Sequence, residues 1–168
     1  CRMGQRAATD MTQPVLEVRH LKVEFSSRED PLLALDDLSF DIAPGEILGV
    51  VGESGAGKSL TGAAIIGLLE PPGRIAGGEI LLDGQRIDGL VDEQMREIRG
   101  RRIGMIFQDS LTSLNPLLTV GQQIVETIQV HLKVDEDEAR MRTIRLLQET
   151  GIPAAEQRID HYPHQFSG

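Results

Sequence analysis

The stretch that decides the fold covers residues 47–59 and reads ILGVVGESGAGKS. Its first part, residues 47–51, is apolar and predicts a short strand buried on both faces of a sheet. The remainder satisfies the pattern G-x-x-x-x-G-K-[ST] in every fixed position. Residues 60–69 then predict a helix, which Pro71 and Pro72 end. A strand, a glycine-rich loop and a helix therefore follow one another in the order that this motif requires.

The glycine-rich loop has the chemistry of a phosphate cradle. Gly52, Gly55 and Gly57 let the backbone turn so that successive N–H groups face inward at the start of a helix. Lys58 is expected to reach the β- and γ-phosphates of a nucleotide, and Ser59 offers a hydroxyl oxygen to Mg²⁺. The predicted nucleotide contacts comprise the whole loop and the residue after it: Gly52, Glu53, Ser54, Gly55, Ala56, Gly57, Lys58, Ser59 and Leu60. Glycine-rich turns are also common at strand ends, but an ordinary turn does not require a Gly-Lys-Ser triplet at this spacing.

The motif implies a nucleoside triphosphate with Mg²⁺ but does not by itself identify the reaction. ATPases, GTPases and kinases all use this cradle. A GTPase also needs a guanine-reading motif of the N-K-x-D type, and the sequence contains none.

The composition fits one soluble domain with a hydrophobic core. The chain has 168 residues, of which 40% are hydrophobic and 26% are charged. A formal net charge of −9 argues against nucleic acid as a partner. The single cysteine, Cys1, can form no internal disulfide, which suits the cytosol. No apolar run approaches the roughly 20 residues that cross a bilayer. We interpret residues 1–10 as a leader, a tag or a misassigned start before Met11.

The rest of the chain predicts a mixed β/α front followed by a helical segment. The predicted strands cover residues 15–25, 35–42, 78–83 and 103–107, and the predicted helices cover residues 92–98, 120–132 and 135–150. In the last of these helices, acidic residues at the start favour the positive end of the helix dipole, and Gly151 and Pro153 end the pattern.

Four segments in this order resemble the ATP-binding subunits of ABC transporters, and most of all those of di- and oligopeptide importers. The segments are LEVRHLKVEF at 16–25, LSFDIAPGEILGVVGESGAGKS at 38–59, IFQDSLTSLNPLLTVGQQI at 106–124 and HYPHQFSG at 161–168. The resemblance implies an α/β fold, a P-loop NTPase of the ABC type. It implies a partial nucleotide-binding domain over residues 11–168, with a β-rich subdomain and P-loop core at 15–109 and the Q-loop and start of a helical subdomain at 110–168. The core sheet is expected to be incomplete.

The resemblance also assigns roles to individual residues. Gln108 is similar to the Q-loop glutamine, whose amide reaches Mg²⁺ or the attacking water, so Lys58 and Gln108 are the expected catalytic residues and Ser59 and Gln108 the expected Mg²⁺ contacts. Phe25 corresponds to the aromatic residue that stacks on adenine, although an aromatic residue in an alternating strand is usually part of the core. The remnant of the signature motif comprises Phe166, Ser167 and Gly168.

By resemblance, the expected function is that of the energy-coupling ATPase of an importer. Its cofactors are ATP and Mg²⁺, and its partners are transmembrane permease subunits, a second nucleotide-binding subunit in a head-to-tail dimer and a separate solute-binding protein. The location is the cytoplasmic side of the inner membrane, held there by the permeases. Residues of the segment after Gln108, namely Leu111, Leu114 and Leu117, either contact the permease or pack on their own domain. His161 and His164 provide too few ligands for a metal and are expected to be structural or solvent-exposed.

Several catalytic elements of the family do not occur in these residues. Hydrolysis in the family needs an acidic strand-end pair and a later switch histidine, and neither segment is present. The chain on its own is therefore expected to have little or no ATPase activity. The alternatives are an ABC-type ATPase unconnected with transport and a nucleotide-binding fragment that does not hydrolyse ATP.

Overall fold

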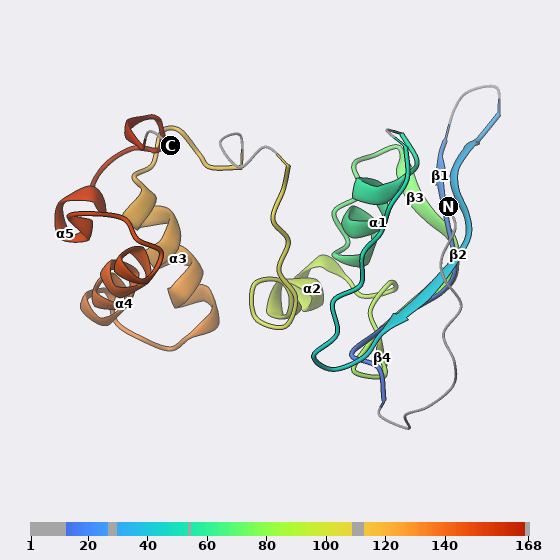
Figure 1. Ribbon diagram of the computed structural model, residues 1–168, viewed down its shortest axis with the longest axis horizontal. Coiled ribbons are helices and arrows are strands. Elements are labelled where there is room, and N and C mark those ends of the chain that lie inside the picture. Colours follow the sequence, from blue (N-terminus) through green and yellow to red (C-terminus); the bar gives the residue numbers. More distant parts are fainter. Residues whose placement is uncertain (1–12, 27–29, 54, 109–112, 167–168) are drawn as a thin grey trace. The chain divides into compact units, whose positions relative to one another are not determined.

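The computed structural model describes residues 13–26, 30–53, 55–108 and 113–166, which fall into two compact units, Cys1–Arg99 and Gly100–Gly168 (Figure 1). The described elements of the first unit are β1 (Leu16–Phe25), β2 (Leu32–Ile42), α1 (Lys58–Ile65), β3 (Gly73–Leu82), β4 (Gln85–Arg86) and α2 (Asp92–Ile98). Those of the second unit are α3 (Val120–His131), α4 (Glu136–Glu149), α5 (Ala155–Arg158) and the 3-10 helix η1 (Pro163–Gln165).

The first unit is built on an antiparallel sheet with the strand order β2-β1-β3-β4. Helices α1 and α2 lie on one side of this sheet (Figure 1). The core between them is apolar, and its buried side chains include Val18, Leu21, Val23, Ile80, Ala64, Ile65, Met95 and Ile98. The predicted strands at 15–25, 35–42 and 78–83 and the predicted helix at 92–98 are therefore confirmed, with β2 and β3 longer than expected.

A bulge in β1 changes the alternation of its side chains. His20 has a φ of 50°, and the pairing of β1 with both neighbours shifts register beside it. Because of this shift, Val18 and Leu21 are both buried although they are three positions apart. Gly78 accommodates the bulge on β3, since a Cβ at this residue would lie 2.4 Å from the carbonyl oxygen of His20.

Helix α1 occupies Lys58–Ile65 rather than the predicted residues 60–69. It ends earlier because Gly67 adopts a left-handed φ of 66°. The N–H of Gly67 donates to Ala64 and that of Leu68 donates to Ala63, which satisfies carbonyls at the end of the helix. The glycine, and not the later prolines, sets the C-terminus of α1.

Two predicted strands are wrong. Residues 47–51 and 104–107 have no regular secondary structure, and Ile47 and Ile106 are 96% and 94% exposed. An apolar run becomes a buried strand only when neighbouring strands pair with it and cover it. The sheet of the first unit ends at β2 and does not include residues 47–51. The chain does return to the sheet after α1, as the predicted strand at 78–83 requires, because β3 pairs antiparallel with β1.

The second unit is helical, as predicted for residues 120–132 and 135–150. Thr119 caps α3, and Asp135 caps α4 by accepting a hydrogen bond from Glu138 N. Gly151, with a φ of 80°, ends α4. The helices enclose a core of buried apolar residues: Val120, Leu147, Ala155 and Ile159.

None of the helices in the described ranges has the length and apolar character needed to cross a membrane.

Candidate functional site

The glycine-rich loop leads directly into α1. Gly57 is the N-cap residue of α1, with a φ of 81°, and Gly55 has a φ of 85°. Both conformations favour glycine. Gly57 is also sterically required, because a Cβ there would lie 2.4 Å from Cδ2 of Leu35 on β2. Leu35 is buried, so this contact fixes the start of α1 against the sheet.

Lys58 folds back over the loop that precedes it. Its ammonium group donates hydrogen bonds to the carbonyl oxygens of Gly52 at 2.7 Å and Glu53 at 2.6 Å. Among the described residues, these three predicted site residues are therefore brought together. The carbonyl oxygens occupy the place on the ammonium group where phosphate oxygens would bind.

The N-terminus of α1 is suited to an anion. Gly57 supplies no side-chain cap, and no acidic residue lies in the first turn. The first N–H groups of a helix have no acceptor within the helix, and they carry the positive end of its dipole. Ser59 is exposed in this first turn, and its hydroxyl oxygen is a hard donor of the kind that Mg²⁺ prefers. The described residues thus fit a phosphate group with an associated Mg²⁺.

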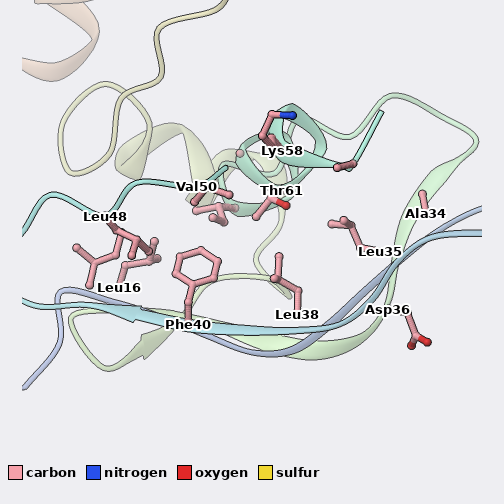
Figure 2. Close-up of a pocket in the computed structure, with 14 residues that line it drawn as sticks. Leu16, Ala34, Leu35, Asp36, Leu38, Phe40, Leu48, Val50, Lys58 and Thr61 are labelled. Carbon is pink, nitrogen blue, oxygen red and sulfur yellow. The ribbon is translucent and has the colours of Figure 1, made fainter. Parts of the chain in front are cut away.

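An apolar cavity of about 390 Å³ lies between α1, β2 and the segment before the loop. Figure 2 shows Leu38, Phe40 and Leu48 turned into this space, whereas the ammonium group of Lys58 points away from it. Phosphate chemistry belongs at the helix N-terminus, since an apolar cavity cannot replace the hydration of an anion. Ala56 and Lys58 also line this cavity, which therefore borders the predicted phosphate contacts.

Gln108 lies in the second unit and is exposed, at the end of the irregular segment 104–107. Its role beside Mg²⁺ stays a prediction. Ser54, Leu111, Ser167 and Gly168 lie outside the described residues, as do residues 1–12.

Phe25 ends β1 and is half-buried. Its ring lies close to Gly73 on β3, where an added Cβ would be 2.8 Å from the Cε1 atom of Phe25. This packing accounts for the partial burial of the ring. The stacking of adenine on Phe25 stays a prediction.

The two histidines of the C-terminal segment make ring contacts with their neighbours. The His161 ring meets Phe166 edge to face with a centroid separation of 6.4 Å, and the His164 ring stacks on Tyr162 at 5.8 Å. No group of three or more metal-ligating side chains gathers among the described residues.

Arg99 is a residue that the sequence analysis missed. Its guanidinium group donates to the carbonyl oxygens of Ile66 and Gly67, both at 2.8 Å, and to Asp92 at 2.7 Å. The arginine therefore satisfies carbonyls just beyond α1 and ties α2 to the helix that follows the glycine-rich loop. No local pattern could have revealed it, because its partners on the α1 side lie more than 30 positions away in sequence.

Comparison with known proteins identifies the family. The model of the family described as "ABC transporter" matches residues 35–168. The chain is 43% identical over 155 residues to the oligopeptide transport ATP-binding protein OppD of Bacillus subtilis, covering 92% of this chain and 43% of the relative. It is also 43% identical over 154 residues to the dipeptide transport ATP-binding protein DppD of Escherichia coli, covering 92% and 47%. The chain thus spans less than half the length of these relatives.

Solved structures agree on the fold. The dimeric structure of MJ0796, a bacterial ABC transporter cassette, matches with a TM-score of 0.76 and 26% identity over 91% of this chain and 63% of the other. A post-hydrolysis dimer of the same cassette bound to ADP and Pi matches with a TM-score of 0.74 and 23% identity over 90% and 63%. The predicted α/β P-loop NTPase fold of the ABC type is confirmed. The glycine-rich loop, the helix that it opens and the family match together show that the chain belongs to the ABC transporter family of ATP-binding proteins.

Proposed function

We propose that the chain is the ATP-binding, energy-coupling part of an ABC importer for di- or oligopeptides. The observation that carries this proposal is the combination of the Lys58 loop at the uncapped start of α1 with the 43% identity to peptide-transport ATP-binding proteins. Transport ATPases of this kind convert ATP binding and hydrolysis into movement of membrane subunits. In the whole protein, residues 15–109 would supply the nucleotide core and residues 110–168 the Q-loop and helical subdomain.

Nucleotide binding would begin with an exchange of hydrogen-bond partners at Lys58. The ammonium group gives up the carbonyl oxygens of Gly52 and Glu53 and takes oxygens of the β- and γ-phosphates instead. The N–H groups at the start of α1 donate to the same phosphates. Ser59 would hold Mg²⁺, which would neutralise part of the phosphate charge.

The remaining roles follow from family membership. Gln108 would orient the attacking water or contact Mg²⁺ through its side-chain amide. Phe25 would stack on the adenine ring. A second nucleotide-binding subunit, permease subunits and a solute-binding protein would complete the transporter, at the cytoplasmic face of the membrane. MJ0796, the cassette with a similar fold, is dimeric, which supports the paired arrangement.

Peptide uptake into proteoliposomes tests the proposal. The whole protein that contains this chain would be reconstituted with its membrane subunits and a solute-binding protein, and ATP-dependent uptake of a labelled dipeptide would be measured. Uptake that requires ATP and is lost in Lys58→Met supports peptide import. ATP hydrolysis without any effect of permeases or peptide would indicate an ABC-type ATPase that is not a transporter. Nucleotide binding without hydrolysis would indicate a non-hydrolysing protein.

A further inference from the structure

The side-chain amide of Gln123, on the first turns of α3, holds together the loop that precedes this helix. Its Nε2 atom donates to the carbonyl oxygens of Asn115 at 3.0 Å, Leu118 at 3.1 Å and Thr119 at 3.4 Å. Its Oε1 atom accepts a hydrogen bond from the N–H of Asn115 at 2.9 Å. One side chain thus bonds the beginning and the end of the loop Asn115–Thr119.

The chemistry of these bonds requires an amide at position 123. The two hydrogens of Nε2 serve three carbonyl oxygens, so one hydrogen is shared, while Oε1 serves an N–H donor. A carboxylate of the same length would keep the acceptor but would face the carbonyl oxygens with negative charge. An apolar side chain of similar length would fill the space and make none of the bonds.

The loop has further internal bonds that depend on its closed form. The Asn115 side chain accepts a hydrogen bond from Leu117 N at 3.0 Å, and Leu118 N donates to the Asn115 carbonyl at 3.3 Å. Thr119 accepts from Gln122 N at 3.1 Å and caps α3. Leu117 is 82% exposed at the tip of this closed loop. The loop therefore presents an apolar side chain to solvent on a backbone that Gln123 fixes.

The same end of α3 carries a second segment, which lies far from the loop in sequence. Val120 N donates to the carbonyl oxygen of His161 at 2.9 Å, and Gly121 N donates to that of Ile159 at 2.8 Å. The approach is so close that a Cβ on Gly121 would lie 2.4 Å from the Ile159 Cγ1 atom. Ile159 is fully buried in the core of the second unit, so this segment cannot shift without α3.

We propose that Gln123 is a positioning residue that makes the loop Asn115–Thr119 move with the end of α3, and through it with the segment 159–161. The inference rests on the proposed function, in which the region after Gln108 meets the permease. A displacement of the loop by a membrane subunit would then also displace α3 and, with it, residues 159–161. With the amide removed, the loop would move independently of α3, and nucleotide turnover would no longer respond to transport.

The test uses the whole protein in the reconstituted transporter, with the variant Gln123→Met. Hydrogen exchange at the amides of Asn115, Leu117 and Leu118 is expected to be about tenfold faster, because several hydrogen bonds that close the loop are lost. The stimulation of ATPase activity by peptide-loaded binding protein is expected to fall to about the basal level. The basal kcat and the KM for ATP are expected to stay within about twofold of wild type, because the hydrogen bonds of the Gln123 amide involve none of the nucleotide contacts proposed above.

Two further variants complete the design. Gln123→Glu is expected to lose the stimulation as Gln123→Met does, although its side chain fills the same space. Gln148→Met is the matched control, since the side chain of Gln148 on α4 donates a hydrogen bond to Glu156 at 2.7 Å and, within the described residues, makes none to the loop or to α3. It is expected to retain both the stimulation and the slow exchange.

The outcomes separate this inference from the proposed function. A wild-type transporter that responds to peptide, together with a Gln123→Met variant that responds equally and keeps slow loop exchange, would overturn the role of Gln123 alone. A wild-type protein that hydrolyses ATP without any response to peptide would overturn the proposed function, and this inference with it. Loss of stimulation in both Gln123 variants, with basal kinetics retained, would support the inference.

Discussion

The ammonium group of Lys58 lies 2.7 Å from the carbonyl oxygen of Gly52, so the cation expected to hold phosphate closes its own loop. A second bond to the Glu53 carbonyl at 2.6 Å completes this arrangement. Both bonds are exposed, and exchanging them for charged phosphate oxygens strengthens them, since hydrogen bonds between two charged groups exceed those to a neutral carbonyl. The ammonium group of Lys58, which is expected to bind the nucleotide phosphates, therefore stabilises the conformation of the loop.

Gly57→Ala is expected to disturb the start of α1 for two separable reasons. The left-handed φ of 81° disfavours any Cβ by about 1–2 kcal/mol, and that Cβ would lie 2.4 Å from Leu35 Cδ2. Unfolding in urea, followed by circular dichroism, measures the loss. Gly45→Ala is the matched control, because Gly45 has a φ of 73° and no atom within 4 Å of an added Cβ.

The steric part of the Gly57 effect can be isolated in a double variant. Gly57→Ala combined with Leu35→Ala removes the methyl group that the new Cβ would meet. The destabilisation by Gly57→Ala is then expected to shrink to that of Gly45→Ala. An equal effect of Gly57→Ala in both backgrounds would show that the contact with Leu35 does not constrain the start of α1.

Arg99→Met is expected to lower the free energy of unfolding by about 1–3 kcal/mol, because it leaves carbonyl oxygens beyond α1 without a charged donor. Thermal or urea unfolding provides the measurement. Arg96→Met on the exposed face of the same helix α2 is the control and is expected to change stability by less than about 0.5 kcal/mol. Equal effects of the two variants would contradict the role of Arg99 as the link between α1 and α2.

Asp88 is expected to make the first unit less stable in acid. Burial by itself raises the pKa of Asp88, but hydrogen bonds from Arg86 and from the N–H of Ile80 outweigh it and leave the pKa below its usual value. A carboxyl group with a lowered pKa in the folded state stabilises that state above the unfolded pKa of 3.8. This contribution is lost as the pH falls through the folded pKa.

The measurement is the free energy of unfolding between pH 7 and pH 2, for wild type and Asp88→Asn. The variant is expected to be less stable than wild type at pH 7, and the difference is expected to shrink below pH 3.8. A difference that does not change with pH would contradict the ionised state of Asp88 as its source.

Sequence patterns located the loop and most elements because these depend on local chemistry. The spacing of Gly52, Gly57 and Lys58 predicted a loop before a helix, and the structure has Gly57 as the N-cap of α1. The apolar residues that recur every fourth position from Val120 likewise predicted α3, which Thr119 caps. Such features need no information about distant parts of the chain.

The misses depend on contacts between distant residues. The apolar residues around Ile47 predicted a buried strand, but no strand of the described sheet pairs with them. The bulge at His20 and its partner Gly78 require knowledge of which strands are neighbours. The hydrogen bonds of the Gln123 side chain were missed for another reason. A glutamine on the polar side of a helix is normally solvated, and the amide of Gln123 finds hydrogen-bond partners only because the loop folds back onto it.

Equilibrium titration with Mg-ATP tests the central claim most directly. Wild type and Lys58→Met would be compared by calorimetry, with Lys22→Met as the control. Lys22 pairs with Asp36 on the sheet and, within the described residues, makes no hydrogen bond to the glycine-rich loop. The account predicts that Lys58→Met weakens ATP binding at least about tenfold, because a charge-assisted bond to phosphate contributes about 1.5–3 kcal/mol, and that Lys22→Met binds as wild type does. Equal affinity of wild type and Lys58→Met would contradict the assignment of this loop as the phosphate site.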